Sequence, residues 1–191
     1  MSDELVFTAH VPRSPVGRLV IWATTKGLRR IEFTSGAELA RAGERWVVPG
    51  AVPGAPDAPA HLNAAVTQLS AYFEGRAPRF DVPLDPQPAT LFQQHVWRRL
   101  RQIPHGEFIS YGELAKAVGA EKGARAVGQA VGANPLPIVI PCHRVVAADG
   151  TLHGFSGGLK RKAALLRLEG FHVDSEGPEG RVLRDVLDLG L

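Results

Sequence analysis

The sequence is poor in cysteine and lacks any long apolar run. A single cysteine, Cys142, excludes an intrachain disulfide, a zinc finger and a cysteine-rich cluster. No apolar stretch approaches the roughly 18 residues that cross a bilayer, so we expect no integral membrane protein. The first four residues include two acids and no long apolar stretch follows them, so we expect no signal peptide. These absences favour a cytoplasmic protein without membrane contact.

The net charge is small as well, but the charged residues are unevenly distributed along the chain. The 191 residues carry a formal net charge of only +3. Residues 95–169 hold 11 Lys and Arg against 5 Asp and Glu, whereas residues 1–94 are balanced at 9 against 9 and residues 170–191 are acidic. A basic middle segment favours an anionic partner, and a solvated protein face explains the charge alone equally well.

The length allows one domain or two small ones, and a β-rich first half followed by a mainly helical second half predicts two domains in an α/β (α+β) protein. The boundaries that we expect are an N-terminal α/β domain over 1–88, a mainly helical domain over 89–175, and an acidic tail of unknown role over 176–191. Two proline-rich stretches interrupt the first domain, a loop at 49–60 and a linker at 77–88.

The spacing of apolar residues places the elements within both domains. In the first domain, residues 17–23 and 28–33 predict two strands around a turn, and residues 61–74 predict an amphipathic helix. In the second domain, apolar spacing and capping residues predict four helices, at 90–103, 111–118, 123–133 and 159–168. The middle two, joined by a short turn that contains glycine, have the layout of a helix-turn-helix.

The predicted helix at 123–133 carries almost no bulky side chain and one long cation, Arg125. Gly128 and Gly132 each cost roughly 1 kcal/mol of helix propensity relative to alanine. Such a composition favours a close approach of the helix backbone to another surface. Close packing against a second helix explains it, and so does a groove of DNA; the sequence leaves both open.

The single cysteine stands in a setting suited to a nucleophile. Residues 138–140 predict a buried strand of β-branched residues, and Cys142 follows with His143 and Arg144 behind it. Basic neighbours lower the pKa of a thiol and favour the reactive thiolate. In an extended chain Cys142 and His143 face opposite sides, so a bridging water explains a link between them as well as direct contact does. An inert buried cysteine is the open alternative.

The last predicted helix carries charges that oppose its macrodipole. Three cations, at positions 160 to 162, begin the helix, and Glu169 ends it. This reversal indicates partners outside the helix, namely phosphate groups for the cations and an imidazole for Glu169. Ordinary scatter of surface charge is the alternative.

Residues 106–170 resemble the C-terminal domain of the O6-alkylguanine-DNA alkyltransferases, also called methylated-DNA–protein-cysteine methyltransferases. The matching motifs, in order, are Ser110-Tyr111, Arg125-Ala126-Val127-Gly128, Asn134-Pro135, Pro141-Cys142-His143-Arg144-Val145 and Lys162…Leu165-Leu166…Glu169-Gly170. The resemblance is strong over about residues 90–170. It implies a ribonuclease H-like first domain and a winged helix-turn-helix-like second domain that carries the cysteine.

The resemblance also implies repair of DNA by direct reversal of damage. The alkylated guanine is flipped out of the duplex and its alkyl group passes irreversibly to the cysteine, so each protein molecule acts once. The implied catalytic residues are Cys142 as nucleophile, His143 as its base through a water, Glu169 to orient His143, Tyr111 as donor to the departing guanine, and Asn134 to brace the turn before the cysteine.

The remaining residues carried over from the family bind the base or the duplex. Val145, Phe155 and Ser156 contact the guanine or its alkyl group. Arg125 fills the hole left by the flipped base, and the small residues around it lie in the minor groove. The implied DNA-binding set is Arg125, Ala124, Ala126, Gly128, Tyr111, Arg144 and Lys160.

We therefore expect a monomer whose partner is double-stranded DNA containing O6-alkylguanine. We expect no metal and no other cofactor, and activity on O4-alkylthymine stays open. One alternative is a non-enzymatic DNA-binding protein that senses damage, which would leave Cys142 unalkylated. A turnover thiol hydrolase that uses Cys142 and His143 ranks last, because nothing in the sequence supplies its substrate pocket.

Overall fold

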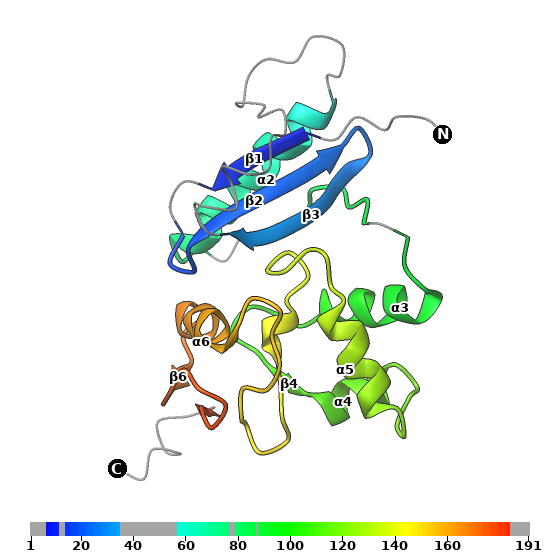
Figure 1. The fold of residues 1–191 in the computed structure, drawn as a ribbon, viewed down its shortest axis with the longest axis vertical. Coiled ribbons are helices and arrows are strands. Elements are labelled where there is room, and N and C mark those ends of the chain that lie inside the picture. The colour runs from blue at the N-terminus through cyan, green and yellow to red at the C-terminus, as the bar shows by residue number, and fades with distance from the viewer. Residues whose placement is uncertain (1–6, 12–13, 35–56, 77–78, 87, 184–191) are drawn as a thin grey trace. The chain divides into compact units, whose positions relative to one another are not determined.

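The chain divides into two units, Met1–Pro88 and Ala89–Leu191 (Figure 1). The computed structural model describes residues 7–11, 14–34, 57–76, 79–86 and 88–183. Most of the predicted proline-rich loop lies outside the described residues, as does the end of the predicted tail. Within these described ranges, no helix has both the length and the apolar character that crossing a membrane requires.

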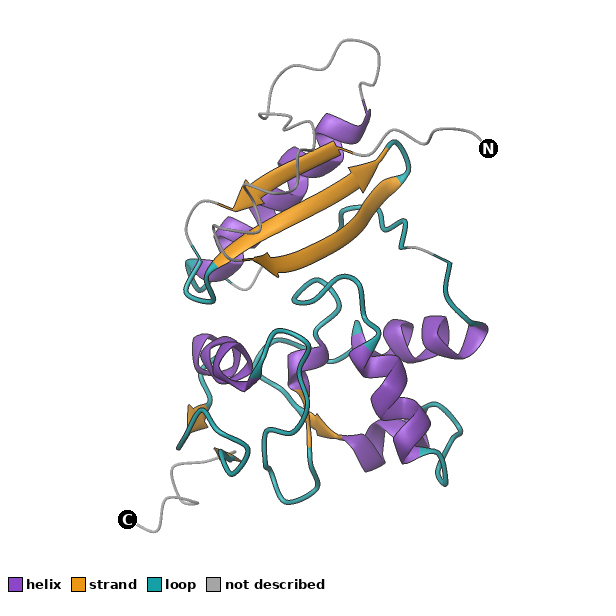
Figure 2. Cartoon of the chain, viewed as in Figure 1, coloured by secondary structure: helices purple, strands orange, loops and turns teal. Residues whose placement is uncertain are grey.

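In its described residues, the first unit is a three-stranded antiparallel sheet with a helix packed on it (Figure 2). The strands follow one another in space as they do in the chain, with Leu19 opposite Phe33 and Ile21 opposite Ile31. The elements are β1 (Phe7–Val11), β2 (Arg18–Thr24), β3 (Gly27–Thr34) and α2 (Asp57–Phe73).

Alternating apolar residues of the sheet and one stripe of α2 make the core of this unit. Leu19 and Ile21 of β2 are fully buried, as is Leu69 of α2. The two predicted strands are confirmed, each to within one residue at either end. The helix begins four residues before its predicted start, because a proline is tolerated in a first turn, where its missing N–H has no intrahelical partner.

The predicted linker contributes to the first unit. The amide of Leu28 donates to the carbonyl of Pro83 at 2.8 Å, and the amide of Asp85 donates to the carbonyl of Leu28 at 2.7 Å. Gly27 has a φ of +151°, and a side chain there would overlap the Pro83 carbonyl. The Asp85 carboxylate accepts from Thr24 and from Arg29, which ties this segment to the sheet.

The second unit is mainly helical. Its helices are α3 (Leu91–Leu100), α4 (Tyr111–Ala117), α5 (Ala124–Gly132) and α6 (Leu159–Leu168), with a single 3-10 turn, η1 (Cys142–Arg144). Two short strands, β4 (Ile109–Ser110) and β5 (Val145–Val146), pair in parallel. The helices α3, α4 and α5 pack together, whereas α6 contacts η1 and β6 (His172–Val173).

Capping explains where two of these helices begin. The hydroxyl of Thr90 accepts from the amide of Gln93, whose side chain accepts from the amide of Thr90. Ser110 and Glu113 form the same reciprocal pair at the start of α4. Local signals of this kind fix helix ends, and the predicted helix-turn-helix layout of α4 and α5 is confirmed.

Two expectations for this unit differ from the structure. The strand predicted at 138–140 is wrong, because these residues form a tight turn in which the amide of Ile140 donates to the carbonyl of Leu136. The residues before and after it are prolines, which limit sheet pairing. Residues 176–183, assigned to the acidic tail, belong to the second unit, where β7 (Val182–Leu183) pairs with β6.

Candidate active site

Asn134 holds the turn that precedes the cysteine. Its amide nitrogen donates to the carbonyl of Ile140 at 2.8 Å and to Cys142 Sγ at 3.1 Å, and its Oδ1 accepts from the amide of Leu136 at 3.0 Å. Ile138 lies within this turn at a φ of 76°, a strained value for a β-branched residue. Strain of this kind is retained where the surroundings over-determine a backbone, so Asn134 fixes the position of the thiol.

Cys142 is a buried thiol, with 3% of its surface exposed. Burial raises its pKa, because a thiolate is poorly solvated there, and the Asn134 hydrogen bond and the charge of Lys162 oppose this rise. The expectation that basic neighbours lower the pKa of the resting thiol is therefore wrong. In the resting protein Cys142 is a thiol, and a base must remove its proton before the sulfur can react.

His143 and Glu169 form the contact that the sequence predicts. Nε2 of His143 lies 2.9 Å from Oε1 of Glu169, and both side chains are fully buried. Burial lowers the pKa of His143, which is therefore neutral at pH 7. Since a carboxylate only accepts, Nε2 carries the hydrogen and Nδ1 carries the lone pair of a base.

Arg144 keeps Glu169 ionised. Nε of Arg144 donates to Oε2 of Glu169 at 2.8 Å and Nη2 donates to Oε1 at 2.8 Å, while Nη1 donates to the carbonyl of Ile103 at 2.6 Å. Burial alone would raise the pKa of Glu169, but the hydrogen bonds from His143 and Arg144 and the charge of Arg144 hold this pKa well below its usual range. The resemblance includes Arg144 in the DNA-binding set, but this expectation is wrong, because the guanidinium is buried and bonded to Glu169 and to the carbonyl of Ile103.

A cavity of about 180 Å³ opens onto the thiol. Cys142 and Tyr111 lie in its wall, and residues 154–156 close one side. Burial and then the charge of Cys142 raise the pKa of Tyr111, so its phenol is protonated and can donate. The wall is completed by residues of α5 and the loop, and the full lining is Tyr111, Gly128, Val131, Gly132, Cys142, Gly154, Phe155 and Ser156.

One face of α5 is left free by the packing of the second unit. The buried face packs against α3 and α4, and Nε1 of Trp97 donates to the carbonyl of Ala130 at 2.7 Å. Ala124, Arg125 and Ala126 are exposed. A Cβ added at Gly128 or at Gly132 would meet no atom of the described residues within 4 Å, so close helix packing does not explain these glycines.

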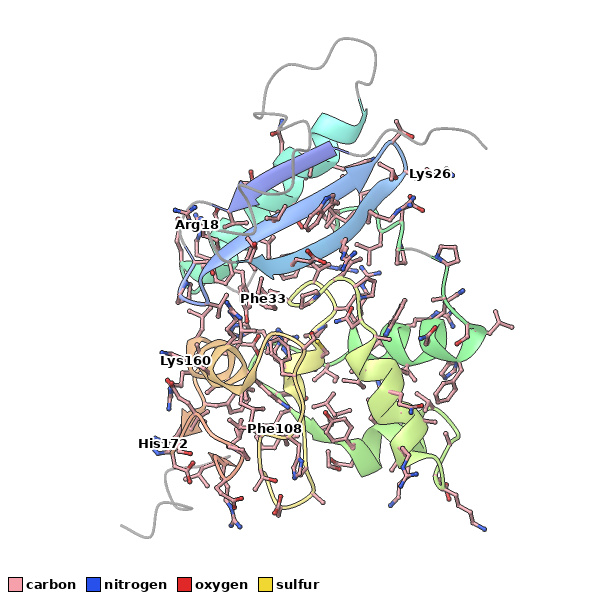
Figure 3. All side chains as sticks on the ribbon, in the orientation of Figure 1. Arg18, Lys26, Phe33, Phe108, Lys160 and His172 are labelled. Atoms are coloured by element: carbon pink, nitrogen blue, oxygen red, sulfur yellow. The ribbon has the colours of Figure 1, made fainter. Side chains whose placement is uncertain are left out.

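The three cations that begin α6 have different surroundings. Lys160 is exposed on the outside of the helix (Figure 3), and Arg161 donates to the carbonyl of Gly157 at 2.9 Å. Lys162 is fully buried and donates to backbone carbonyls, so the expectation that it meets phosphate is wrong.

The resemblance implies that Val145 contacts the guanine or its alkyl group, but Val145 does not line the cavity. Its side chain is fully buried in β5, and its carbonyl accepts from Nζ of Lys162 at 2.6 Å. Phe155 and Ser156 do reach the wall. The sequence reasoning missed Lys162 as a neighbour of the site, although Lys162 stands three residues after Leu159 and three before Leu165, on the inner face of the helix.

Comparison with known proteins covers both units. A family model described as "6-O-methylguanine DNA methyltransferase, DNA binding domain" matches residues 91–171, and "6-O-methylguanine DNA methyltransferase, ribonuclease-like domain" matches residues 8–86. A methylated-DNA–protein-cysteine methyltransferase of Methanosarcina acetivorans is 40% identical over 157 residues, covering 82% of this chain and 94% of the relative. That of Mycobacterium tuberculosis is 54% identical over 111 residues, covering 58% and 67%.

Solved structures agree with the sequence comparison. The crystal structure of the Mycobacterium tuberculosis O6-methylguanine methyltransferase matches with a TM-score of 0.68 at 41% identity, over 86% of this chain and 93% of that one. A structure of the Mycobacterium tuberculosis protein in complex with DNA matches with a TM-score of 0.68 at 42% identity, over 86% and 91%. With its cysteine, its buried histidine–carboxylate pair and both domains matched, the chain belongs to the methylated-DNA–protein-cysteine methyltransferase family.

Proposed function

We propose that this protein repairs double-stranded DNA by moving the alkyl group from O6 of an alkylated guanine to Sγ of Cys142, once per molecule. The observation that carries the proposal is a buried thiol in the wall of a cavity of about 180 Å³, held by Asn134 and followed by a histidine bonded to a buried carboxylate. The names of the relatives and the DNA complex of one of them support the class of substrate.

The proton and electron steps follow from the groups present. Nδ1 of His143 takes the thiol proton, through a water, and the Glu169 carboxylate stabilises the imidazolium that forms. Sulfur then bonds to the alkyl carbon while the bond from that carbon to O6 breaks and leaves its electron pair on guanine. The Tyr111 phenol donates to the guanine as this charge grows.

The thioether left on Cys142 is a poor leaving group, so the protein is not regenerated. Because the proposed chemistry uses groups of one chain alone, we extend the proposal to a monomer that acts in the cytoplasm. Among the described residues, no three His, Cys, Asp or Glu side chains cluster as metal ligands would.

The exposed face of α5 is the surface that we assign to DNA. Ala124, Ala126 and Gly128 offer little bulk, as a helix in a minor groove requires, and Arg125 is long enough to enter the base stack. We also assign Lys160 to contact with DNA phosphates, because it is an exposed cation. Arg125 thereby supports extrusion of the damaged base into the cavity.

The test is the mass of the intact protein and of its Cys142 peptide after incubation with a duplex that carries one O6-methylguanine. We expect one methyl group on that peptide, at no more than one per protein, and none on the matched variant Cys142→Ser. A duplex that binds without methyl transfer would replace the proposal with damage sensing. Repaired guanine in the duplex in excess of protein would indicate turnover chemistry.

A further inference from the structure

Lys162 is a buried cation that the proposed reaction does not use. It lies in the first turn of α6 and its side chain is fully buried. An ammonium group has three N–H donors, and Nζ of Lys162 donates to three carbonyls, those of Val145 at 2.6 Å, His153 at 2.7 Å and Leu152. Burying a lysine costs free energy unless each of its N–H donors has an acceptor, and all three donors of Lys162 have one.

The three carbonyls join two parts of the site. Val145 directly follows η1, which carries the nucleophile, whereas Leu152 and His153 precede the loop whose residues 154–156 line the cavity. One side chain therefore ties the end of the cysteine turn to the beginning of the opposite wall.

The backbone is strained where the loop at 154–156 begins. His153 has a φ of 30° and Gly154 has a φ of 23°, both outside the favoured regions for ordinary residues. Because such a conformation persists only where neighbours hold it, the bond from Lys162 to the carbonyl of His153 is in the right place to hold this one.

Lys162 also faces the reacting groups electrostatically. Its charge favours the thiolate of Cys142, and the charge of Cys142 in turn favours the ammonium form of Lys162. Burial lowers the pKa of Lys162 to about 7, whereas the three carbonyls that accept from Nζ require three N–H donors and therefore favour the ammonium form. The charge of Lys162 also bears on His143, as do the Glu169 carboxylate bonded to that histidine and the charge of Arg144.

We propose that Lys162 is a positioning residue for alkyl transfer: its ammonium group fixes the loop that walls the cavity and supplies the positive charge that favours the thiolate of Cys142. The inference rests on the proposed function for its effect on repair. Its effects on the thiol and on the loop can be measured without any damaged DNA.

The experiment compares wild type with Lys162→Met, which removes charge and donors, and Lys162→Gln, which keeps two N–H donors without the charge. Lys26→Met is the matched control, since Lys26 is exposed on the β2–β3 turn of the first unit (Figure 3). Three readouts are taken: alkylation of Cys142 by iodoacetamide against pH, amide hydrogen exchange at 154–158, and the rate of methyl transfer from free O6-methylguanine base.

We expect Lys162→Met to shift the pH profile of the thiol upward by about one unit, the scale on which a close opposite charge acts. We expect faster exchange at 154–158 and methyl transfer slowed by about tenfold, with Lys26→Met unchanged. Lys162→Gln should show the same pH shift with slower exchange than Lys162→Met, and it serves as the readout if Lys162→Met does not fold.

A thiol profile that is unchanged in Lys162→Gln would overturn the proposal, and so would exchange at 154–158 that is unchanged in Lys162→Met. Slower transfer without any pH shift would show a purely structural lysine and would also overturn it. Absence of methyl transfer in wild type, from the free base and from damaged duplex, would instead remove the proposed function, while the thiol and exchange measurements would still judge Lys162.

Discussion

Arg144 and Glu169 form a two-point ion pair in which both carboxylate oxygens accept from one guanidinium, each at 2.8 Å. The same carboxylate contacts His143 at 2.9 Å. The residue two positions after the nucleophile therefore sets the charge of the group that orients the base. This pairing accounts for the reversed charge at the end of α6, because Glu169 is stabilised by a partner outside its own helix.

Replacement of Arg144 by Met leaves the Glu169 carboxylate buried without its cation. We expect the free energy of unfolding to fall by about 3 kcal/mol, as when one partner of a buried ion pair is removed. Urea denaturation measures this loss. Affinity for an undamaged duplex, measured where the variant is folded, should change by less than about twofold, because Arg144 makes no phosphate contact in this arrangement.

The matched variant is Lys160→Met, at an exposed cation two residues into α6. Its stability should stay within about 0.5 kcal/mol of wild type, while its affinity for duplex DNA falls and depends less on salt. If Arg144→Met weakened DNA binding as Lys160→Met does, the buried role of Arg144 would be refuted.

Acid should destabilise the protein in two steps. The pKa of His143 is lowered in the folded protein, so below its ordinary value of 6.5 the unfolded chain binds a proton that the native site excludes. The pKa of Glu169 is also lowered, and below 4.5 the unfolded carboxyl binds a proton that the native one does not. Both linkages have the same sign, so the free energy of unfolding decreases as the pH falls.

Urea denaturation at several values between pH 7 and pH 4 checks this. The decrease between pH 6.5 and 5 should be smaller in His143→Gln than in wild type, because glutamine does not titrate. An identical slope in the two proteins would mean that His143 is protonated in the native state.

Replacement of Arg125 by Ala should impair repair of duplex DNA more than reaction with the free base. Only the duplex requires a side chain to occupy the space of the flipped nucleotide. We expect a loss of tenfold or more on duplex, about 1.4 kcal/mol, and less than twofold on free O6-methylguanine. Transfer rates on the two substrates test this, and equal losses would exclude an intercalating role.

Replacement of Gly128 by Ala should separate stability from DNA binding. The position is helical and an added Cβ meets no described atom, so alanine should stabilise the protein by up to about 1 kcal/mol. The same methyl group would stand on the face assigned to the minor groove, where we expect affinity for duplex to fall severalfold. Thermal unfolding and duplex titration give the two numbers, and unchanged affinity would move the groove contact elsewhere.

Elements defined by neighbours in the chain could be predicted from the sequence. The helix at 159–168 has the predicted bounds, and the Ser110–Glu113 pair marks the start of α4 as expected. Each depends on residues within one or two turns of one another. The motif around Cys142 could be found for the same reason, since its residues are adjacent in the chain.

Features that depend on distant partners could not be predicted. The positive φ of Ile138 is imposed by Asn134, and the β-branched run around it is as typical of a strand as of a buried turn. Arginine and lysine side chains are usually exposed. Arg144 is buried because it pairs with Glu169, and Lys162 is buried because backbone carbonyls such as that of Val145 accept from it; neither partner is close in the sequence.

The burial of Cys142 bears on how long an unused molecule lasts. A protein that reacts once must not lose its sulfur to peroxide or to other electrophiles before it meets a lesion. Oxidation and adventitious alkylation both require an accessible thiolate, whereas Cys142 is 3% exposed and burial raises the pKa of its thiol. The enclosure that raises the pKa of the thiol thus also limits its loss to oxidants and to adventitious electrophiles before a lesion is met.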